Sequence, residues 1–342
     1  MNDKYNMIDT DKVKIYDSVD YNYIFDKTTG LFMRWGKTKS DDSECAPSPE
    51  IADIEISTIC NKNCPACYKA NTSKGMNMSL KTFKMVFTNL PNTLTQIAFG
   101  IGSIDANPDL EAILKYTRLQ GVIPNITING ERMNDKWYDM LAETCGAVAV
   151  SMYDYNKCVT ALKELNKRGM KQTNIHMIAA EETFTQCIDL ISNLKRKGDD
   201  KYVNAIVFLC LKPVGRGINM HPMPKDLFAR IVKHANKHNM TIGFDSCSAP
   251  LIYDCYDERI QQMIEPCEST LFSIYINAEG EAFPCSFIEQ AWKGKNGIDV
   301  TKPLNFVNDV WFSETFKMFR NKLMNNKDCD GCRKCPEFKL YD

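Results

Sequence analysis

Two groups of cysteines stand out as residues able to do chemistry. The first is Cys60, Cys64 and Cys67, which are separated by three and then two residues. Iron–sulfur clusters normally take four cysteines, so three thiolates on one short loop can hold three irons of a cubane and leave the fourth open. A zinc site would need a fourth ligand from elsewhere, and the nearest histidine in the sequence is His176. The spacing therefore favours an iron–sulfur cluster.

The second group lies near the end of the chain. Cys267 and Cys285 flank a predicted β hairpin, with residues 272–277 as its first strand and a turn at residues 278–280. A hairpin brings its two ends together, and a returning C-terminal segment can complete a cage of thiolates. Zinc is the alternative occupant, since separated cysteine pairs also suit tetrahedral zinc. The predicted ligands are Cys267, Cys285, Cys329, Cys332 and Cys335, with Cys247 or Cys255 as further candidates.

Composition limits the class of protein. The 342 residues include 15 cysteines, an odd number, and the start of the chain lacks the apolar stretch of a signal peptide. Reduced thiols in the cytoplasm are therefore expected. Because 42 basic residues balance 43 acidic ones, no nucleic-acid-binding surface is indicated. No apolar run approaches the roughly 18 residues that a membrane helix needs.

The elements that position the first cysteines form a β/α series. Short β-branched runs alternate with amphipathic helices between residues 51 and 244, and six or seven such units predict an α/β fold with a parallel sheet. Periodicity alone does not separate an open sheet from a partial or full barrel. The cysteines follow the first strand, at the edge where β/α folds place their chemistry. The predicted strands are residues 53–57, 95–99, 125–128, 147–151, 174–178, 204–211 and 241–244.

The flanks differ from this central part. Residues 1–50 predict a short β meander with a turn at residues 26–30, followed by a linker. Residues 246–342 have weaker periodicity and seven of the 15 cysteines, which predicts a smaller domain held by metal rather than by a large core. The sequence therefore predicts three domains, at residues 1–50, 51–245 and 246–342.

The first cysteine motif resembles that of the radical S-adenosylmethionine (SAM) superfamily in spacing and position. The resemblance covers residues 51 to about 335. It implies a partial (β/α)6 TIM-like barrel and a [4Fe–4S] cluster whose open iron binds SAM. SAM is then cleaved to methionine and a 5′-deoxyadenosyl radical, which abstracts a substrate hydrogen. The cofactor-binding residues that the resemblance implies are Gly100, Gly102, Ser103, Asn129 and Ser151.

Some positions depart from that family or extend the likeness. Ala66 stands where the family usually has an aromatic residue, and the Glu of its glycine motif is missing at Ser103. Residues 213–216 match a Pro-x-Gly-Arg turn that is frequent after the sixth strand. Arg216 in this turn is a candidate partner for a carboxylate.

The second cysteine group resembles the SPASM and shorter twitch extensions of radical SAM enzymes. These carry auxiliary [4Fe–4S] clusters, which implies at least one such cluster here. Ser286 follows Cys285, where sulfatase-maturing members have an Asp, and this argues against that activity.

Three functions follow from these resemblances and from the residues. The first is oxidation or crosslinking of a peptide or protein side chain, with an electron removed through the auxiliary cluster and a flavodoxin- or ferredoxin-type electron donor. The second is dehydrogenation or ring formation on a small molecule. The third is a non-enzymatic zinc or iron–sulfur binding protein. Candidate catalytic residues at strand ends or within the barrel are Asp154, Asp245 and His176.

Overall fold

The computed structural model describes residues 5–261, 264–327 and 333–340. Its main feature is a ten-stranded sheet with the order β11-β10-β9-β8-β7-β6-β5-β12-β13-β14. The strands from β5 to β11 are parallel, and each pairs with its neighbour in sequence. These strands are β5 (Ile51–Glu55), β6 (Gln96–Gly100), β7 (Ile123–Ile128), β8 (Ala147–Ser151), β9 (Thr173–Ala179), β10 (Ala205–Cys210) and β11 (Ile242–Phe244).

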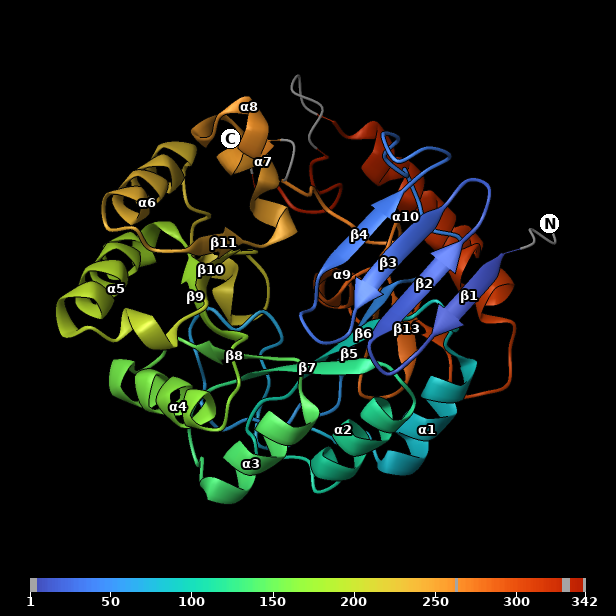
Figure 1. Cartoon of the computed structure of the whole chain (residues 1–342), viewed down its shortest axis with the longest axis horizontal. Coiled ribbons are helices and arrows are strands. Elements are labelled where there is room, and N and C mark those ends of the chain that lie inside the picture. The colour runs from blue at the N-terminus through green and yellow to red at the C-terminus, as the bar shows by residue number, and fades with distance from the viewer. Residues whose placement is uncertain (1–4, 262–263, 328–332, 341–342) are drawn as a thin grey trace.

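One helix follows each of the first six parallel strands. Figure 1 shows these helices in an arc outside the strands, which is the arrangement of an open β/α barrel. The predicted partial (β/α)6 barrel is therefore confirmed. None of the helices in the described ranges is long and apolar enough to cross a membrane. The six helices are α1 (Leu80–Asn89), α2 (Leu110–Leu119), α3 (Asp135–Thr144), α4 (Tyr155–Lys167), α5 (Phe184–Lys197) and α6 (Lys225–Lys237).

Local signals explain where α1 and α2 begin. The Ser79 hydroxyl accepts a hydrogen bond from the Thr82 backbone N–H at 3.1 Å and caps α1, as its position before an apolar periodic run predicts. The Asn107-Pro108 pair predicts a slightly earlier start for α2 than the structure shows. The Asn107 amide instead donates to the carbonyls of Ile56 and Met78, at 2.7 and 2.9 Å, and ties two loops together.

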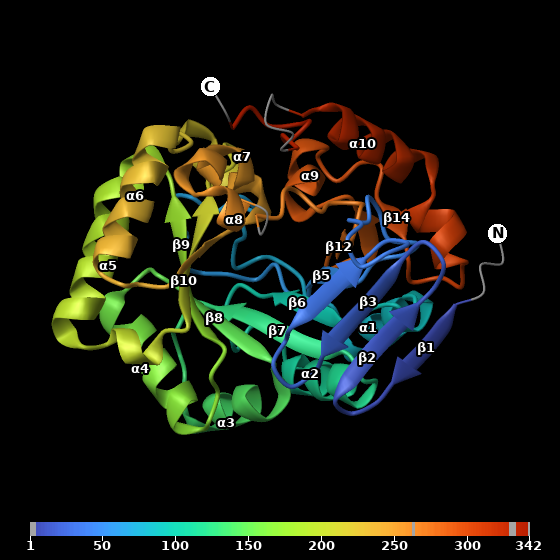
Figure 2. The same cartoon turned by 45° about the horizontal axis from the view of Figure 1, so that its top comes forward.

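The N-terminal region is a four-stranded antiparallel meander, as predicted. Its strands are β1 (Asn6–Asp9), β2 (Val13–Asp17), β3 (Asn22–Asp26) and β4 (Phe32–Trp35). The sheet lies on the side of the barrel that also carries α10 (Glu314–Asn325), as Figure 2 shows. Tyr23 and Phe25 belong to an apolar cluster that also includes Phe319 and Leu323 of α10.

The C-terminal region is joined to the barrel by its backbone. The predicted hairpin is present as β12 (Ser273–Ile276) and β13 (Glu281–Phe283), and β14 (Ile298–Asp299) extends it. β12 also pairs in parallel with β5, so the hairpin continues the barrel sheet. Three short helices complete this part: α7 (Ala249–Ile252), α8 (Glu258–Gln261) and α9 (Ser286–Ala291).

The C-terminal region also shares the apolar cores of its neighbours. Trp311 and Phe316 are fully buried in the main core, and Phe319 packs in the N-terminal cluster. This region therefore has a larger apolar core than the sequence predicts, because the β5–β12 pairing brings it against the barrel. That metal also holds the region together stays a prediction.

A buried ion cluster strengthens this junction. The Lys69 ammonium pairs with the Glu55 carboxylate, with 3.0 Å between Nζ and Oε2, and also contacts Glu289 and the Tyr275 hydroxyl. The Tyr275 hydroxyl donates to Glu55 Oε2 at 3.0 Å. Glu55 belongs to β5, Lys69 to the cysteine-bearing loop, and the other two residues to the C-terminal region. This ion cluster therefore connects β5, the cysteine-bearing loop and the C-terminal region.

Candidate functional site

The loop that carries Cys60, Cys64 and Cys67 leaves the carboxyl end of β5 and folds back on itself. The Cys60 N–H donates to the Thr72 carbonyl at 2.9 Å, and the Cys67 N–H donates to the Cys64 carbonyl at 3.2 Å. Burial raises the pKa of Cys64, and the nearby thiols of Cys67 and Cys60 raise it further. The Cys64 thiol therefore interacts electrostatically with both of the other thiols. Three thiols on a closed loop fit the donor set that an iron–sulfur cluster needs.

The turn after β10 holds this loop from the other side. Arg216 donates from Nε to the Cys64 carbonyl at 2.9 Å and from a terminal nitrogen to the Asn71 carbonyl at 3.1 Å, while its backbone N–H donates to the Cys67 carbonyl at 2.9 Å. Gly215 has φ of +64°, and a Cβ there would lie 2.1 Å from the Tyr68 carbonyl oxygen. The Pro-x-Gly-Arg sequence therefore supports the cysteine loop, and Arg216 bonds backbone carbonyls rather than a carboxylate.

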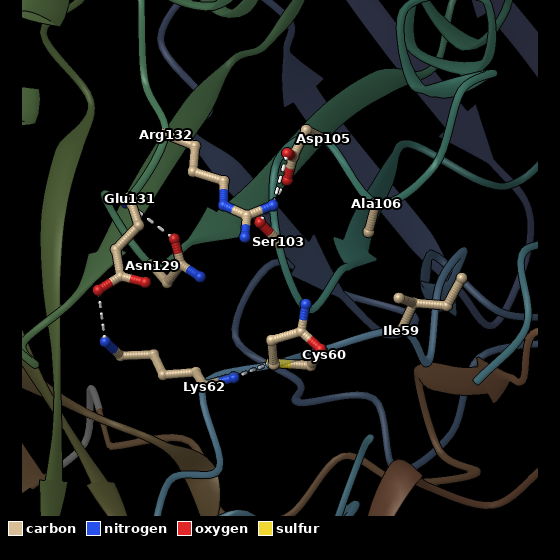
Figure 3. A pocket seen from close by; sticks show the side chains of 10 residues that line it. Ile59, Cys60, Lys62, Ser103, Asp105, Ala106, Asn129, Glu131 and Arg132 are labelled. Carbon is tan, nitrogen blue, oxygen red and sulfur yellow. Dashed lines mark hydrogen bonds and ion pairs between the residues drawn. The ribbon is translucent and has the colours of Figure 1, made fainter. Parts of the chain in front are cut away.

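A cavity of about 370 Å³ lies beside Cys60 (Figure 3). Of the predicted cofactor-binding residues, Ser103 and Asn129 line it. The Asn129 amide donates to the Gly102 carbonyl at 3.0 Å, so the ends of β6 and β7 are joined beneath the cavity. The Ser103 hydroxyl donates to Asp105 at 2.6 Å.

Charged side chains that sequence reasoning missed also line this cavity. Glu131 Oε1 lies 2.9 Å from Lys62 Nζ, and Asp105 lies 2.9 Å from an Arg132 nitrogen. Hydrogen bonds from Lys62 and Lys157 lower the pKa of Glu131, and those from Ser103 and Arg132 lower the pKa of Asp105. The cavity therefore presents both signs of charge. The sequence signal that could have identified Glu131 and Arg132 is their position, because they closely follow Asn129 at the end of β7.

The other predicted cofactor-binding residues do not line this cavity. A Cβ on Gly102 would lie 2.3 Å from the Ile59 carbonyl oxygen and 2.6 Å from Cys60 Cβ, so Gly102 permits the close approach of two loops. At Gly100 a Cβ would meet its nearest atom, Glu55 Cα, at an ordinary 3.5 Å. Ser151 ends β8 and pairs in register with His176 on β9.

The three catalytic candidates have different surroundings. The Asp154 carboxylate accepts from the Lys157 N–H at 2.8 Å and caps α4 on an exposed surface. The Asp245 carboxylate accepts from the Cys210 N–H at 3.1 Å and pairs with Lys212 Nζ at 2.5 Å. His176 lies 3.4 Å from the Thr127 hydroxyl, and burial lowers its pKa to about 4. Asp154 and Asp245 thus have structural partners, and His176 is held neutral.

The second cysteine group is assembled from separate segments. The Ser269 hydroxyl donates to the Pro284 carbonyl at 2.7 Å and draws the two ends of the hairpin together near Cys267 and Cys285. Arg333 Nε donates to the Cys267 carbonyl at 3.1 Å, which places the segment before Cys335 beside the first hairpin cysteine. The predicted ligands Cys329 and Cys332 lie outside the described residues.

Cys247 interacts electrostatically with this group, whereas Cys255 has other neighbours. Burial raises the pKa of Cys267 well above its usual value, and the thiols of Cys247, Cys285 and Cys335 contribute to the increase. Burial likewise raises the pKa values of Cys247 and Cys285 to about 12. Cys255 has Lys225 and Asp254 as its electrostatic neighbours. Cys247, Cys267, Cys285 and Cys335 are each half-buried, and their thiols influence one another electrostatically.

Comparison with known proteins agrees with this geometry. The radical SAM superfamily matches residues 54–210, and the SPASM iron–sulfur cluster-binding domain matches residues 267–336. No curated protein matches the chain.

Solved structures share the fold at low sequence identity. Streptococcus suis SuiB bound to its precursor peptide SuiA is 11% identical, with a TM-score of 0.71 over 97% of this chain and 94% of SuiB. SuiB bound to S-adenosylmethionine is 13% identical, with a TM-score of 0.65 over 85% of this chain and 72% of that one. The enzyme anSMEcpe with bound AdoMet and the Cp18Cys peptide is 14% identical, with a TM-score of 0.58 over 85% of this chain and 89% of its own.

The two family matches overlap both cysteine groups, and each family has a characteristic cofactor. A [4Fe–4S] cluster acts with SAM in the first family, and the SPASM domain binds auxiliary iron–sulfur clusters. The chain therefore belongs to the radical SAM superfamily and carries a C-terminal SPASM domain.

Proposed function

We propose that this radical SAM enzyme abstracts a hydrogen from a peptide or protein side chain and thereby oxidises or crosslinks it. The observation that carries the proposal is the closed loop of Cys60, Cys64 and Cys67 beside a charged cavity at the carboxyl edge of the barrel. When bound, the cluster supplies the electron that splits SAM. Support for a peptide substrate comes from the likeness to SuiB in complex with its precursor peptide, which extends over 97% of this chain.

The cavity has groups that suit the amino-acid end of SAM. The SAM ammonium can pair with the carboxylate of Glu131 or Asp105, and the SAM carboxylate can pair with Lys62 or Arg132. Charge-assisted hydrogen bonds of this kind are stronger than neutral ones and fix orientation. Asn129 and Gly102 keep the neighbouring strand ends together through their 3.0 Å hydrogen bond. We propose that six residues, rather than Ser151 or Gly100, mainly determine the orientation of SAM. They are Lys62, Gly102, Asp105, Asn129, Glu131 and Arg132.

The auxiliary site is proposed at Cys247, Cys267, Cys285 and Cys335. Its role is to receive the electron that leaves the substrate radical, and a flavodoxin- or ferredoxin-type protein is the proposed donor for the first cluster. Cys329 and Cys332 stay predicted ligands. No disulfide is found among the cysteines in the described ranges, which supports a reducing compartment such as the cytoplasm.

The test is deuterium transfer under anaerobic conditions. Iron-reconstituted protein is given SAM, dithionite and synthetic peptides that carry deuterated Cys, Ser, Lys or Tyr side chains. We expect 5′-deoxyadenosine to form and to acquire deuterium from one class of peptide, while the Cys60→Ala/Cys64→Ala/Cys67→Ala variant forms none. Absence of SAM cleavage in the reconstituted protein would contradict the enzyme assignment. Deuterium transfer only from small molecules would contradict the peptide part of the proposal.

A further inference from the structure

A buried lysine lies among the thiols of the second cysteine group. Lys212 follows β10, and its side chain is only 2% exposed. Its Nζ lies 2.5 Å from Asp245 Oδ2 and 4.4 Å from the centroid of the Phe287 ring. An ammonium group without water needs compensating charge, because desolvation of an ion is costly. Lys212 is therefore held in a defined place by one carboxylate and one aromatic face.

The two partners of Lys212 belong to the segments that carry two of the thiols. Asp245 precedes Cys247 by two residues, and Phe287 follows Cys285 by two residues. The other Asp245 oxygen is already engaged, since it accepts from the Cys210 N–H at 3.1 Å and from the Ser248 hydroxyl at 2.6 Å. The ammonium thus sits where the end of the barrel meets the start of α9.

The ammonium also acts on the thiols themselves. The Lys212 charge opposes the increase that burial causes in the pKa values of Cys247, Cys210 and Cys335. Its charge therefore acts on Cys247 and Cys335, two of the four proposed ligands. Water screens this charge weakly, because the Lys212 side chain is itself buried.

Resting on the auxiliary cluster of the proposed function, we propose that Lys212 is a positioning residue that fixes a positive charge against that cluster and raises its reduction potential. One-electron reduction adds one negative charge to the cluster, so a nearby fixed cation stabilises the reduced form more than the oxidised form. The electron comes from the substrate radical during turnover and from dithionite in the test. Lys212 thereby makes the auxiliary site a better electron acceptor.

The experiment isolates the auxiliary cluster in full-length protein with the substitutions Cys60→Ala, Cys64→Ala and Cys67→Ala. Lys212→Met, Lys212→Arg and Lys225→Met are compared in this background by a potentiometric titration followed by electron paramagnetic resonance. Lys225 is the matched control, because it pairs with Asp254 on the surface of the same region. We expect Lys212→Met to shift the midpoint to a more negative potential with iron content retained. Lys212→Arg and Lys225→Met should stay near the parent value.

The outcomes separate this inference from the function it rests on. An unchanged midpoint in Lys212→Met with full iron content would overturn the role of Lys212. If Lys212→Met binds less iron, Lys212→Gln is titrated instead, because its amide can still donate to Asp245 without carrying a charge. Iron loss in both neutral variants would show a structural role and overturn the inference. A parent protein that binds no iron would refute the auxiliary cluster itself.

Discussion

Cysteines in this protein have environments that differ with their position. Cys145, Cys158, Cys187 and Cys210 are buried in the apolar core, as their place in periodic segments predicts. Burial raises the pKa values of Cys145, Cys158 and Cys187 to about 12, so these thiols stay protonated at neutral pH. The described cysteines of the two groups are instead half-buried, and they influence one another electrostatically.

Replacement of Cys247 tests the auxiliary ligand set. In the background that lacks Cys60, Cys64 and Cys67, we expect Cys247→Ala to lose more than half of the bound iron, since a [4Fe–4S] cluster normally needs four ligands. Cys255→Ala is the matched control, because this thiol lies near Lys225 and Asp254. Iron and sulfide per chain are the measurements. Equal iron content in the two variants would speak against Cys247 as a ligand.

His176 predicts a dependence of stability on pH. Burial lowers its pKa to about 4, whereas an unfolded histidine titrates near 6.5. The unfolded state therefore binds more protons between these values, and stability falls as the pH drops from about 6.5 toward 4. We expect the loss from this residue to be about 2 kcal/mol at pH 5, relative to pH 7. Urea unfolding of iron-free protein at pH 7 and pH 5 should show a smaller decrease for His176→Gln than for the parent, and equal decreases would refute the expectation.

At the scale of elements, strand ends and turns build the site. The segment after β6 approaches the cysteine loop so closely that a Cβ on Gly102 would meet Ile59 and Cys60. The turn after β10 fixes the same loop through Arg216 and Gly215. Neither turn belongs to the cysteine motif, yet both determine where the three thiols lie.

A pair of glycine substitutions tests this arrangement. We expect Gly102→Ala to displace the cysteine loop, at a cost of about 1–3 kcal/mol for an overpacked contact. Reconstituted iron and the yield of 5′-deoxyadenosine should both fall. Gly100→Ala is the control, because its Cβ would make only ordinary contacts with Glu55. If both variants reconstitute equally well, close approach at Gly102 is not what positions the loop.

At the scale of the whole molecule, the barrel and the C-terminal region form one packed body. The β5–β12 pairing and the shared apolar core connect them, and the Lys69 ion cluster lies at their junction. Lys69, Glu55 and Glu289 have side chains that are 6%, 7% and 13% exposed. Burial raises the pKa of Glu55, and Lys69 opposes that increase.

Removal of the Lys69 charge should destabilise this junction. Lys69→Met leaves Glu55 and Glu289 buried without their cation, which we expect to cost about 3–5 kcal/mol. Urea unfolding of the iron-free protein measures the loss. Lys115→Met, which breaks an exposed pair with Glu111 on α2, should cost less than about 1 kcal/mol. A double variant with Glu289→Gln should recover part of the loss, and similar stabilities for the Lys69 and Lys115 variants would contradict a junction role.

Sequence patterns alone predict the β/α series, the meander turn, the hairpin and the two cysteine groups. These features depend on local periodicity and spacing, which neighbouring residues encode directly. The fold was needed to show that β12 continues the sheet beside β5 and that Cys247, unlike Cys255, interacts electrostatically with the second group. It also brought Glu131 and Arg132 into the cavity and Lys212 against the thiols. Such contacts join segments far apart in the chain, and they form only when burial of the shared core selects one packing among many that the local pattern allows.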